Sequence, residues 1–286
     1  MATIKELLDY GMEQLVSSGN EYAKYERKVL LQDVLSVNYM YMLMNGDEQV
    51  SADKEKQYKD LIERRTAHYP LQYLLGYAHF MDYTFNVNEN VLIPRSDTEI
   101  LVEIINDSYD DICKLHGTDN NIKLLDICCG SGCIGISLKL YHRDIKLTLS
   151  DVSEAALDVA ASNLEKYKIE NALLNKGSLY QGIEDRYNII VCNPPYIESD
   201  IVETLMPEVR EYEPRLALDG GADGLDFYRS IIKDAEKHLA DKGYIFFEIG
   251  YNQGRAVSAL LEEAGFVDVE IKKDYAGMDR VVFGHL

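Results

Sequence analysis

The chain has 286 residues, of which 47% are hydrophobic and 27% charged. This composition is that of an ordinary globular protein, long enough for one large or two modest domains. No segment approaches the roughly 18 consecutive apolar residues of a membrane span, and the N-terminus lacks the basic start and apolar run of a signal peptide. We therefore expect a cytoplasmic protein with no membrane partner.

The charge and the cysteines exclude further classes. The formal net charge is −20, and most of it falls on residues 81–286, so the larger part of the chain repels a nucleic-acid backbone at long range. Five cysteines make an odd number, which does not fit a secreted disulfide framework. Cys128, Cys129 and Cys133 lack the paired spacing of a zinc knuckle, so we expect no metal.

The first third of the chain divides into two parts. Residues 1–78 carry apolar side chains at helical spacing, with Ser51 as an expected N-cap, and predict a small helical domain. Residues 79–96 alternate in part and predict a β-hairpin connector. The Ser96-Asp97-Thr98-Glu99 run has the spacing of a capping box, so a helix is expected to start after Ser96.

From residue 97 to 286, apolar strands alternate with helical stretches, which predicts a doubly wound α/β sheet. The expected strands are Lys123–Cys128, Lys146–Ser150, Ala172–Leu174, Ile189–Cys192, Tyr244–Ile249, Val267–Lys272 and Arg280–Gly284. Only Lys273–Asp279 separates the last two strands, which is too short for a helical crossover. They must pair as an antiparallel hairpin. A Rossmann-like sheet closed by such a hairpin is typical of methyltransferases that use S-adenosylmethionine (SAM).

A glycine turn follows the first strand of this sheet. Gly130, Gly132 and Gly135 satisfy the G-x-G-x-x-G pattern, which brings backbone close to a ligand at a helix N-terminus. Asp151 ends the next strand, where a carboxylate can accept hydrogen bonds from both hydroxyls of a ribose. These features suit any adenosine cofactor, including a nicotinamide dinucleotide.

Asp126 favours SAM over a dinucleotide. It lies inside the strand before the turn, where a pyrophosphate would be repelled by a buried carboxylate. Methyltransferases typically place an acidic residue there, near the amino-acid part of the cofactor. A purely structural role, in which the carboxylate caps the glycine turn, stays open.

The tetrapeptide Asn193-Pro194-Pro195-Tyr196 follows a strand expected beside the cofactor strand. The Asn193 side-chain oxygen and the Pro194 carbonyl can each accept one N–H of a planar NH2 group, the two prolines stiffen the loop, and Tyr196 can stack on a flat group. The pattern predicts methyl transfer to an amide or amine nitrogen by positioning. We expect no general base. A rigid loop without chemistry is the alternative.

These segments resemble a known family, the protein-(glutamine-N5) methyltransferases that modify peptide chain release factors (PrmC, formerly HemK). The resemblance covers nearly the whole chain. It rests on Pro70–Gly76, Val91–Glu99, the glycine turn, Asp151, Asn193–Tyr196, Tyr212–Leu218, Gly224–Tyr228, Phe247–Gly250 and Asp279–Val282.

The resemblance implies a substrate and a set of site residues. The methyl acceptor would be the glutamine of the Gly-Gly-Gln motif of class 1 release factors, the product N5-methylglutamine, and residues 1–78 would help dock the release factor. Asn193, Pro194, Pro195 and Tyr196 would hold the glutamine amide. SAM would be held by Asp126, Cys128, Cys129, Gly130, Ser131, Gly132, Asp151, Ser178, Leu179 and Asn193, giving S-adenosylhomocysteine as the second product.

The chain departs from the family pattern in two places. Cys128-Cys129 replaces the usual Gly-Thr, which puts contacts from that turn in doubt. Ser178-Leu179 replaces an acidic residue followed by an aromatic one near the adenine.

Three other functions compete with this interpretation. A nucleic-acid amino methyltransferase of the adenine-N6 type shares the Asn-Pro-Pro-Tyr motif, but the acidic charge argues against direct nucleic-acid binding. A nicotinamide-dependent oxidoreductase conflicts with Asp126 and the terminal hairpin. A SAM-binding protein without turnover conflicts with the intact motifs. We expect a monomeric enzyme.

Overall fold

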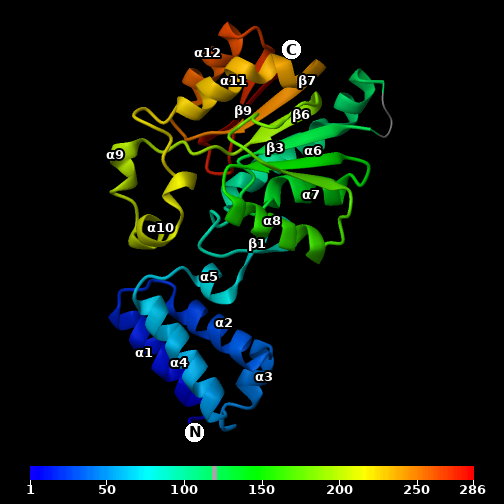
Figure 1. Cartoon of the computed structure of the whole chain (residues 1–286). Helices are drawn as coiled ribbons and strands as arrows, with labels where there is room; N and C mark the ends of the chain where they lie inside the picture. The colour runs from blue at the N-terminus through cyan, green and yellow to red at the C-terminus, as the bar shows by residue number, and fades with distance from the viewer. Residues whose placement is uncertain (118–120) are drawn as a thin grey trace. The chain divides into compact units, whose positions relative to one another are not determined.

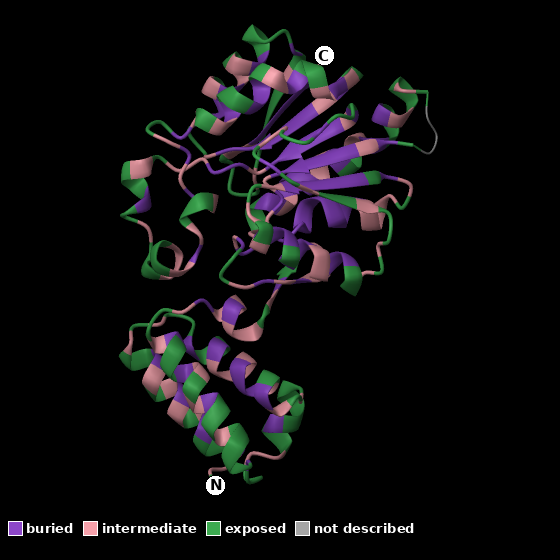
Figure 2. Ribbon diagram, in the orientation of Figure 1, coloured by how far each residue is buried: buried purple, intermediate pink, exposed green. Residues whose placement is uncertain are grey.

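The computed structural model describes residues 1–117 and 121–286, which form two compact units. The first unit consists of Met1–Gly76 with Met206–Tyr212, and the second of Tyr77–Leu205 with Glu213–Leu286. Each unit has buried apolar side chains of its own (Figure 2). In the described residues, no helix combines the length and apolar composition needed to cross a membrane.

The first unit is helical, as the apolar spacing predicts. Its helices are α1 (Ile4–Ser17), α2 (Ala23–Leu35), α3 (Tyr39–Met44), α4 (Ala52–Thr66), α5 (Leu71–Leu75) and α10 (Pro207–Tyr212). α1 begins with a capping box, in which the Thr3 hydroxyl accepts the Glu6 N–H and the Glu6 carboxylate accepts the Thr3 N–H. Apolar residues of α1, α2 and α4 form the core.

Helix α10 comes from far along the chain and still belongs to this unit. The buried guanidinium of Arg65 binds Glu26 at 2.7 Å and Glu208 of α10 at 3.0 Å. The Tyr212 hydroxyl donates to the Ala67 carbonyl at 2.7 Å. The charge of Arg65 is therefore balanced where water does not reach it, which a buried ion requires. No local pattern in the sequence indicates this long-range contribution.

The second unit is built on a seven-stranded sheet (Figure 1). Its strands are β3 (Lys123–Ile127), β4 (Lys146–Asp151), β5 (Ala172–Lys176), β6 (Tyr187–Cys192), β7 (Leu239–Glu248), β8 (Val267–Lys273) and β9 (Asp279–His285). The order is β5-β4-β3-β6-β7-β9-β8. The first five strands in this order are parallel, whereas β9 pairs antiparallel with both β7 and β8. The predicted terminal hairpin is confirmed.

The other elements of this unit cover the sheet or precede it. The helices are α6 (Ser96–Leu115), α7 (Cys133–Tyr141), α8 (Glu154–Lys166), α9 (Ser199–Val202), the 3₁₀ helix η1 (Arg215–Ala217), α11 (Asp226–His238) and α12 (Gly254–Glu263). A separate antiparallel hairpin pairs β1 (Tyr77–Phe80) with β2 (Tyr83–Asn86). It overlaps the connector predicted over residues 79–96 but begins two residues before it.

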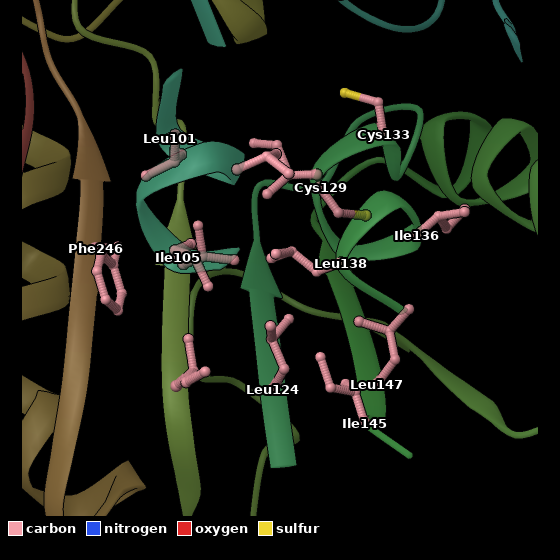
Figure 3. Close-up of a cluster of buried hydrophobic side chains, with 14 of the residues drawn as sticks. Leu101, Ile105, Leu124, Cys129, Cys133, Ile136, Leu138, Ile145, Leu147 and Phe246 are labelled. Atoms are coloured by element: carbon pink, nitrogen blue, oxygen red, sulfur yellow. The ribbon is translucent and has the colours of Figure 1, made fainter. Parts of the chain in front are cut away.

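Alternate side chains of each central strand enter two different cores, because successive strand residues point to opposite faces. Leu124 of β3 packs with residues of α6, α7 and α8, whereas Leu125 packs with residues of α11 and α12. Figure 3 shows part of the first core, where Leu101 and Ile105 of α6 lie near Phe246 of β7. The sheet therefore has helices on both faces, as predicted for a doubly wound fold.

Two predicted helix starts differ in detail. Ser96 is the first residue of α6 rather than its cap, so the capping box predicted from Ser96 and Glu99 is not formed. Glu99 instead accepts the backbone N–H of Met81 at 2.5 Å, a tertiary contact that competes for the same carboxylate. Ser51 does precede α4, but within the described residues its side chain makes no capping hydrogen bond.

Candidate active site

A cavity opens at the carboxyl ends of the central strands of the second unit, the usual ligand site of such sheets. The strand pair β3 and β6 is in register at Ile127 and Cys192, so the residues that follow each strand are neighbours. The cavity is lined by Asn90, Val91, Leu92, Pro94, Arg95, Thr98, Cys128, Cys129, Gly130, Ser131, Cys133, Ile134, Asp151, Val152, Ser153, Ala156, Asn193, Pro195, Pro214, Leu216, Ala217 and Phe227.

The glycine turn forms one wall of the cavity. Three of its residues adopt left-handed backbone conformations: Cys128 (φ 59°), Gly130 (φ 53°) and Gly132 (φ 75°). A Cβ atom at Gly130 would meet nothing within 4 Å, whereas one at Gly132 would lie 3.0 Å from Ile136 Cδ1. Glycine at the first position leaves the cavity wall open, and glycine at the second permits close packing.

Asp126 lies behind this turn and is fully buried. Its Oδ2 accepts the Gly135 N–H at 2.9 Å, while its Oδ1 has no hydrogen-bond partner in the described part of the chain. Burial raises the pKa of this carboxyl to about 7, and the hydrogen bond from Gly135 opposes that rise. Asp126 is not among the lining residues. Its observed contact is with the first turn of α7, so cofactor binding by this carboxylate stays a prediction.

Asp151 ends β4 and does line the cavity. Its Oδ2 accepts the Gly130 N–H at 3.0 Å and its Oδ1 accepts the Ser153 N–H at 2.9 Å. Burial raises its pKa, and these two N–H groups lower it. Each carboxylate oxygen offers about two acceptor sites, so both can accept a further hydroxyl from a ligand.

The loop after β6 brings Asn193 and Pro195 to the cavity. The Asn193 amide donates from Nδ2 to Thr98 Oγ1 at 3.4 Å. The Tyr196 hydroxyl points elsewhere and donates to Glu248 Oε1 at 3.2 Å. Neither Pro194 nor Tyr196 is a lining residue among those described.

A second segment holds this loop in place. Ile197 donates its N–H to Leu218 O at 3.0 Å, and Gly220 donates its N–H to Ile197 O at 2.8 Å. The Gln253 side chain donates to Tyr196 O at 2.9 Å. The loop is therefore fixed by two backbone hydrogen bonds and by one from the Gln253 side chain.

Comparisons with known proteins show the family of this chain. Residues 6–76 match the family model described as PrmC N-terminal domain, and residues 98–209 match methyltransferase small domain. A release factor glutamine methyltransferase of Clostridium acetobutylicum is 38% identical over 98% of this chain and 97% of its own length. The corresponding protein of Geobacter sulfurreducens is 37% identical over 99% and 97%. The chain belongs to the release factor glutamine methyltransferase family.

A solved structure supports the fold separately. The T. thermophilus 16S rRNA N2 G1207 methyltransferase, in complex with AdoMet and guanosine, matches with a TM-score of 0.51 at 18% identity, covering 73% of this chain and 49% of that one. This match shows that the chain shares the fold of that methyltransferase.

The family resemblance implies two further cofactor residues, Ser178 and Leu179. Neither is among the residues that line the cavity. Ser178 and Leu179 lie in the turn after β5 and line a different depression, together with residues of α11. Leu179 contributes its carbonyl oxygen to a hydrogen bond from Ser150 at 3.5 Å. Contact of Ser178 and Leu179 with a cofactor stays a prediction, as do the cofactor roles of Cys128 to Gly132.

Glu213 and Arg215, which lie in one of the family segments, have defined partners here. Glu213 is buried; it forms an ion pair with Arg95 and also accepts the Ile93 N–H at 3.2 Å. It thus joins the Leu-Ile-Pro-Arg segment to the Glu-Pro-Arg-Leu segment. Arg215 pairs with Glu203 and Asp219 on the exposed surface, where such pairs contribute little.

The sequence patterns predicted no site role for Thr98 or for Val152, both of which line the cavity. Thr98 is buried in α6 and reads as one more residue of an amphipathic helix. Val152 is half-exposed beside Asp151, and that exposure is visible only in the folded chain. The sequence offered two signals for these residues. Thr98 lies within a family segment, and Val152 directly follows Asp151.

Proposed function

We propose that this chain transfers a methyl group from SAM to the side-chain nitrogen of the glutamine in the Gly-Gly-Gln motif of class 1 release factors, forming N5-methylglutamine. One observation carries the proposal. The glycine turn, Asp151 and Asn193 line a single cavity in a chain of the release factor glutamine methyltransferase family.

The polar groups that line the cavity suit an adenosine cofactor. Asp151 supplies a carboxylate for ribose hydroxyls, and the turn from Cys128 to Gly132 supplies open backbone at the N-terminus of α7. Val152 and Ile134 give an apolar wall suited to a flat ring. When bound, SAM supplies a methyl group on a sulfonium, which needs no further activation by the protein. We propose no metal.

Asn193 and Pro194 are proposed to position the substrate amide. The Asn193 side-chain oxygen and the Pro194 carbonyl would each accept one N–H of the glutamine NH2. No donor among the described residues is bonded to the Pro194 carbonyl oxygen. An amide nitrogen is a weak nucleophile, and positioning alone lowers such a barrier by as much as about 7–11 kcal/mol. The proton would pass to water. Pro195 would stiffen the loop, and Tyr196 would stack on the flat amide group of the substrate.

The proposal assigns each part of the chain a task. Residues 97–286 would carry out the transfer, residues 1–78 would dock the release factor, and residues 79–96 would connect them. The acidic charge of the chain suits a protein substrate better than a nucleic acid. We propose a monomer acting in the cytoplasm.

The experiment is transfer of labelled methyl from SAM to a release factor. The same release factor with its Gly-Gly-Gln glutamine changed to alanine must take up no label. Asn193→Ala is expected to abolish transfer while SAM affinity falls by less than about tenfold, because the amide serves the substrate. Asn171→Ala, at an exposed position of the same unit, is the control. Turnover by Asn193→Ala would contradict the assigned role.

A further inference from the structure

A buried hydrogen-bonded cluster lies directly behind Asn193. Thr98 lines the cavity, is 2% exposed, and receives the Asn193 Nδ2–H at its Oγ1. Glu248, at the end of β7, is 1% exposed and does not line the cavity. Helix α6 and strand β7 thus meet behind the tetrapeptide loop with two buried polar side chains, Thr98 and Glu248.

The two oxygens of the Glu248 carboxylate differ in their hydrogen bonds. Its Oε1 accepts the Tyr196 hydroxyl at 3.2 Å. Its Oε2 is buried and has no direct hydrogen-bond partner among the residues that the structure describes. Burial raises the pKa of Glu248 to about 7, and the Thr98 hydroxyl comes first among the groups that lower it again. The Thr98 hydroxyl is therefore the donor available to this carboxylate.

The single proton of the Thr98 hydroxyl links its contact with Glu248 to its contact with Asn193. A threonine hydroxyl has one proton to donate and two lone pairs to accept with. If the proton goes to the Glu248 carboxylate, Thr98 faces Asn193 only as an acceptor. It then binds the Nδ2 end of the Asn193 amide, which is the contact observed.

The two ends of an asparagine amide have nearly the same shape and opposite hydrogen-bonding character. With Nδ2 held at Thr98, Oδ1 faces the other way and is available as an acceptor. The reversed amide would present an NH2 group to a substrate NH2 group, so one of the two acceptors that position the substrate would be lost.

We propose that Thr98 and Glu248 are positioning residues that hold the Asn193 side chain with its oxygen presented to the substrate amide. The inference deepens the proposed function and rests on it. Tyr196 donates to Oε1 of the same carboxylate and so links the far end of the tetrapeptide to Glu248.

Ionisation of Glu248 sets a pH dependence for this arrangement. A protonated Glu248 no longer requires the Thr98 proton and can donate to Oγ1 instead, leaving Thr98 free to donate to Asn193 Oδ1. The productive orientation is therefore lost as pH falls through the pKa of about 7. The titratable and charged groups facing Glu248 from the surrounding elements are Tyr196, Arg280, Asp97, Tyr228 and Cys133.

Arg280 is a cation that lowers the pKa of Glu248, and it is already paired. Its guanidinium binds Asp274 at 3.1 Å and Asp97 at 3.2 Å. It lowers the pKa of Glu248 less than the Thr98 hydroxyl does. The hydroxyl of Thr98, and not an ion pair, is the contact to test.

The experiment compares Thr98→Val with Thr98→Ser in steady-state methylation of a release factor. Valine keeps the branched shape and removes the hydroxyl, whereas serine keeps the hydroxyl. We expect Thr98→Val to lower kcat by about tenfold or more, with SAM affinity changed less than about twofold, because one positioning hydrogen bond is lost. Thr98→Ser should recover most of that loss. Thr148→Val, at a buried threonine of β4 that accepts a hydrogen bond from Tyr187, is the matched control.

The pH profile separates positioning from a structural role. Wild type and Thr148→Val should lose kcat as pH falls through about 7. Thr98→Val should be slow at all pH values and lack this step, and Glu248→Gln, if folded, should lack it too. An equal loss in the valine and serine variants, or an unchanged step in Thr98→Val, would overturn the inference. A wild-type chain that does not methylate the release factor would instead overturn the proposed function.

Discussion

Gly220 lies against Pro195 with no room for a side chain. A Cβ atom at Gly220 would be 2.7 Å from the Pro195 carbonyl oxygen and 2.7 Å from the Tyr196 Cα. Both neighbours are backbone atoms, so a side chain at Gly220 has to move the loop itself. The shape of this loop therefore depends partly on the absence of a side chain at Gly220, 25 residues away in the chain.

Gly220→Ala should therefore impair catalysis more than folding or cofactor binding. Moving the Asn193–Tyr196 loop by a few tenths of an ångström misplaces the two acceptors of the substrate amide. We expect kcat to fall by about tenfold to a hundredfold, since small misplacements of reacting groups are costly. SAM affinity, measured by calorimetry, should change by less than about threefold.

Gly46→Ala is the control for this substitution. A Cβ atom at Gly46 would meet its nearest neighbours at 3.8 Å, an ordinary contact. This variant should keep wild-type kcat. A Gly220→Ala enzyme with full activity would show that the loop tolerates displacement.

Asp151→Ala should weaken SAM binding in particular. The carboxylate lines the cavity and also accepts N–H groups from Gly130 and Ser153, so its removal loses ligand contacts and loosens the turn. Hydrogen bonds to a charged group contribute about 1.5–3 kcal/mol, which corresponds to a rise in Kd of roughly tenfold to a hundredfold. Asp158→Ala, an exposed change in α8, should leave Kd unaltered. Unchanged affinity in Asp151→Ala would remove this residue from the cofactor site.

Local patterns predicted the sheet well because its strands follow from spacing along the chain. The short Lys273–Asp279 connection could only join antiparallel strands, and β8 and β9 do pair in that way. The adjacency of β3 and β6 followed from the same topology rules and placed Asn193 beside the glycine turn. These inferences need only the order and length of the elements.

Contacts between distant segments could not be predicted from such local patterns. The role of Thr98 depends on α6 meeting β7 behind the tetrapeptide loop, and α10 joins the N-terminal unit through Arg65 and Glu208. Neither follows from hydrophobic periodicity, which assigns a buried face but not its partner. The Ser96 capping box failed for a similar reason, since Glu99 is used by Met81.

Stability should depend on pH through Asp126. Burial raises its folded-state pKa to about 7 from a model-peptide value of 3.8, so the folded chain binds more protons than the unfolded chain between these values. Stability therefore falls as pH rises through this window. Asp126→Asn removes the ionisation and keeps an acceptor for the Gly135 N–H. We expect the variant to gain stability relative to wild type between pH 5 and pH 8, by a few kcal/mol.

Urea denaturation at both pH values measures this effect. Glu248 has a raised pKa in the same window and contributes with the same sign in both proteins, so the difference between them isolates Asp126. A pH-independent difference would mean that Asp126 is ionised in the folded chain at pH 5 as well as at pH 8.

Cys128 and Cys129 give a matched test of backbone strain in the glycine turn. Cys128 has a φ of 59°, which costs an L-residue about 1–2 kcal/mol, and Cys129 is not among the residues with positive φ. Glycine relieves that strain and loses about 0.5–1 kcal/mol in chain entropy. We expect Cys128→Gly to leave the free energy of unfolding unchanged or raise it by up to about 1 kcal/mol. Cys129→Gly, at a buried side chain, should lower it by about 1–3 kcal/mol. Equal destabilisation in both variants, measured by urea denaturation without ligand, would show that packing of the Cys128 side chain outweighs its backbone strain.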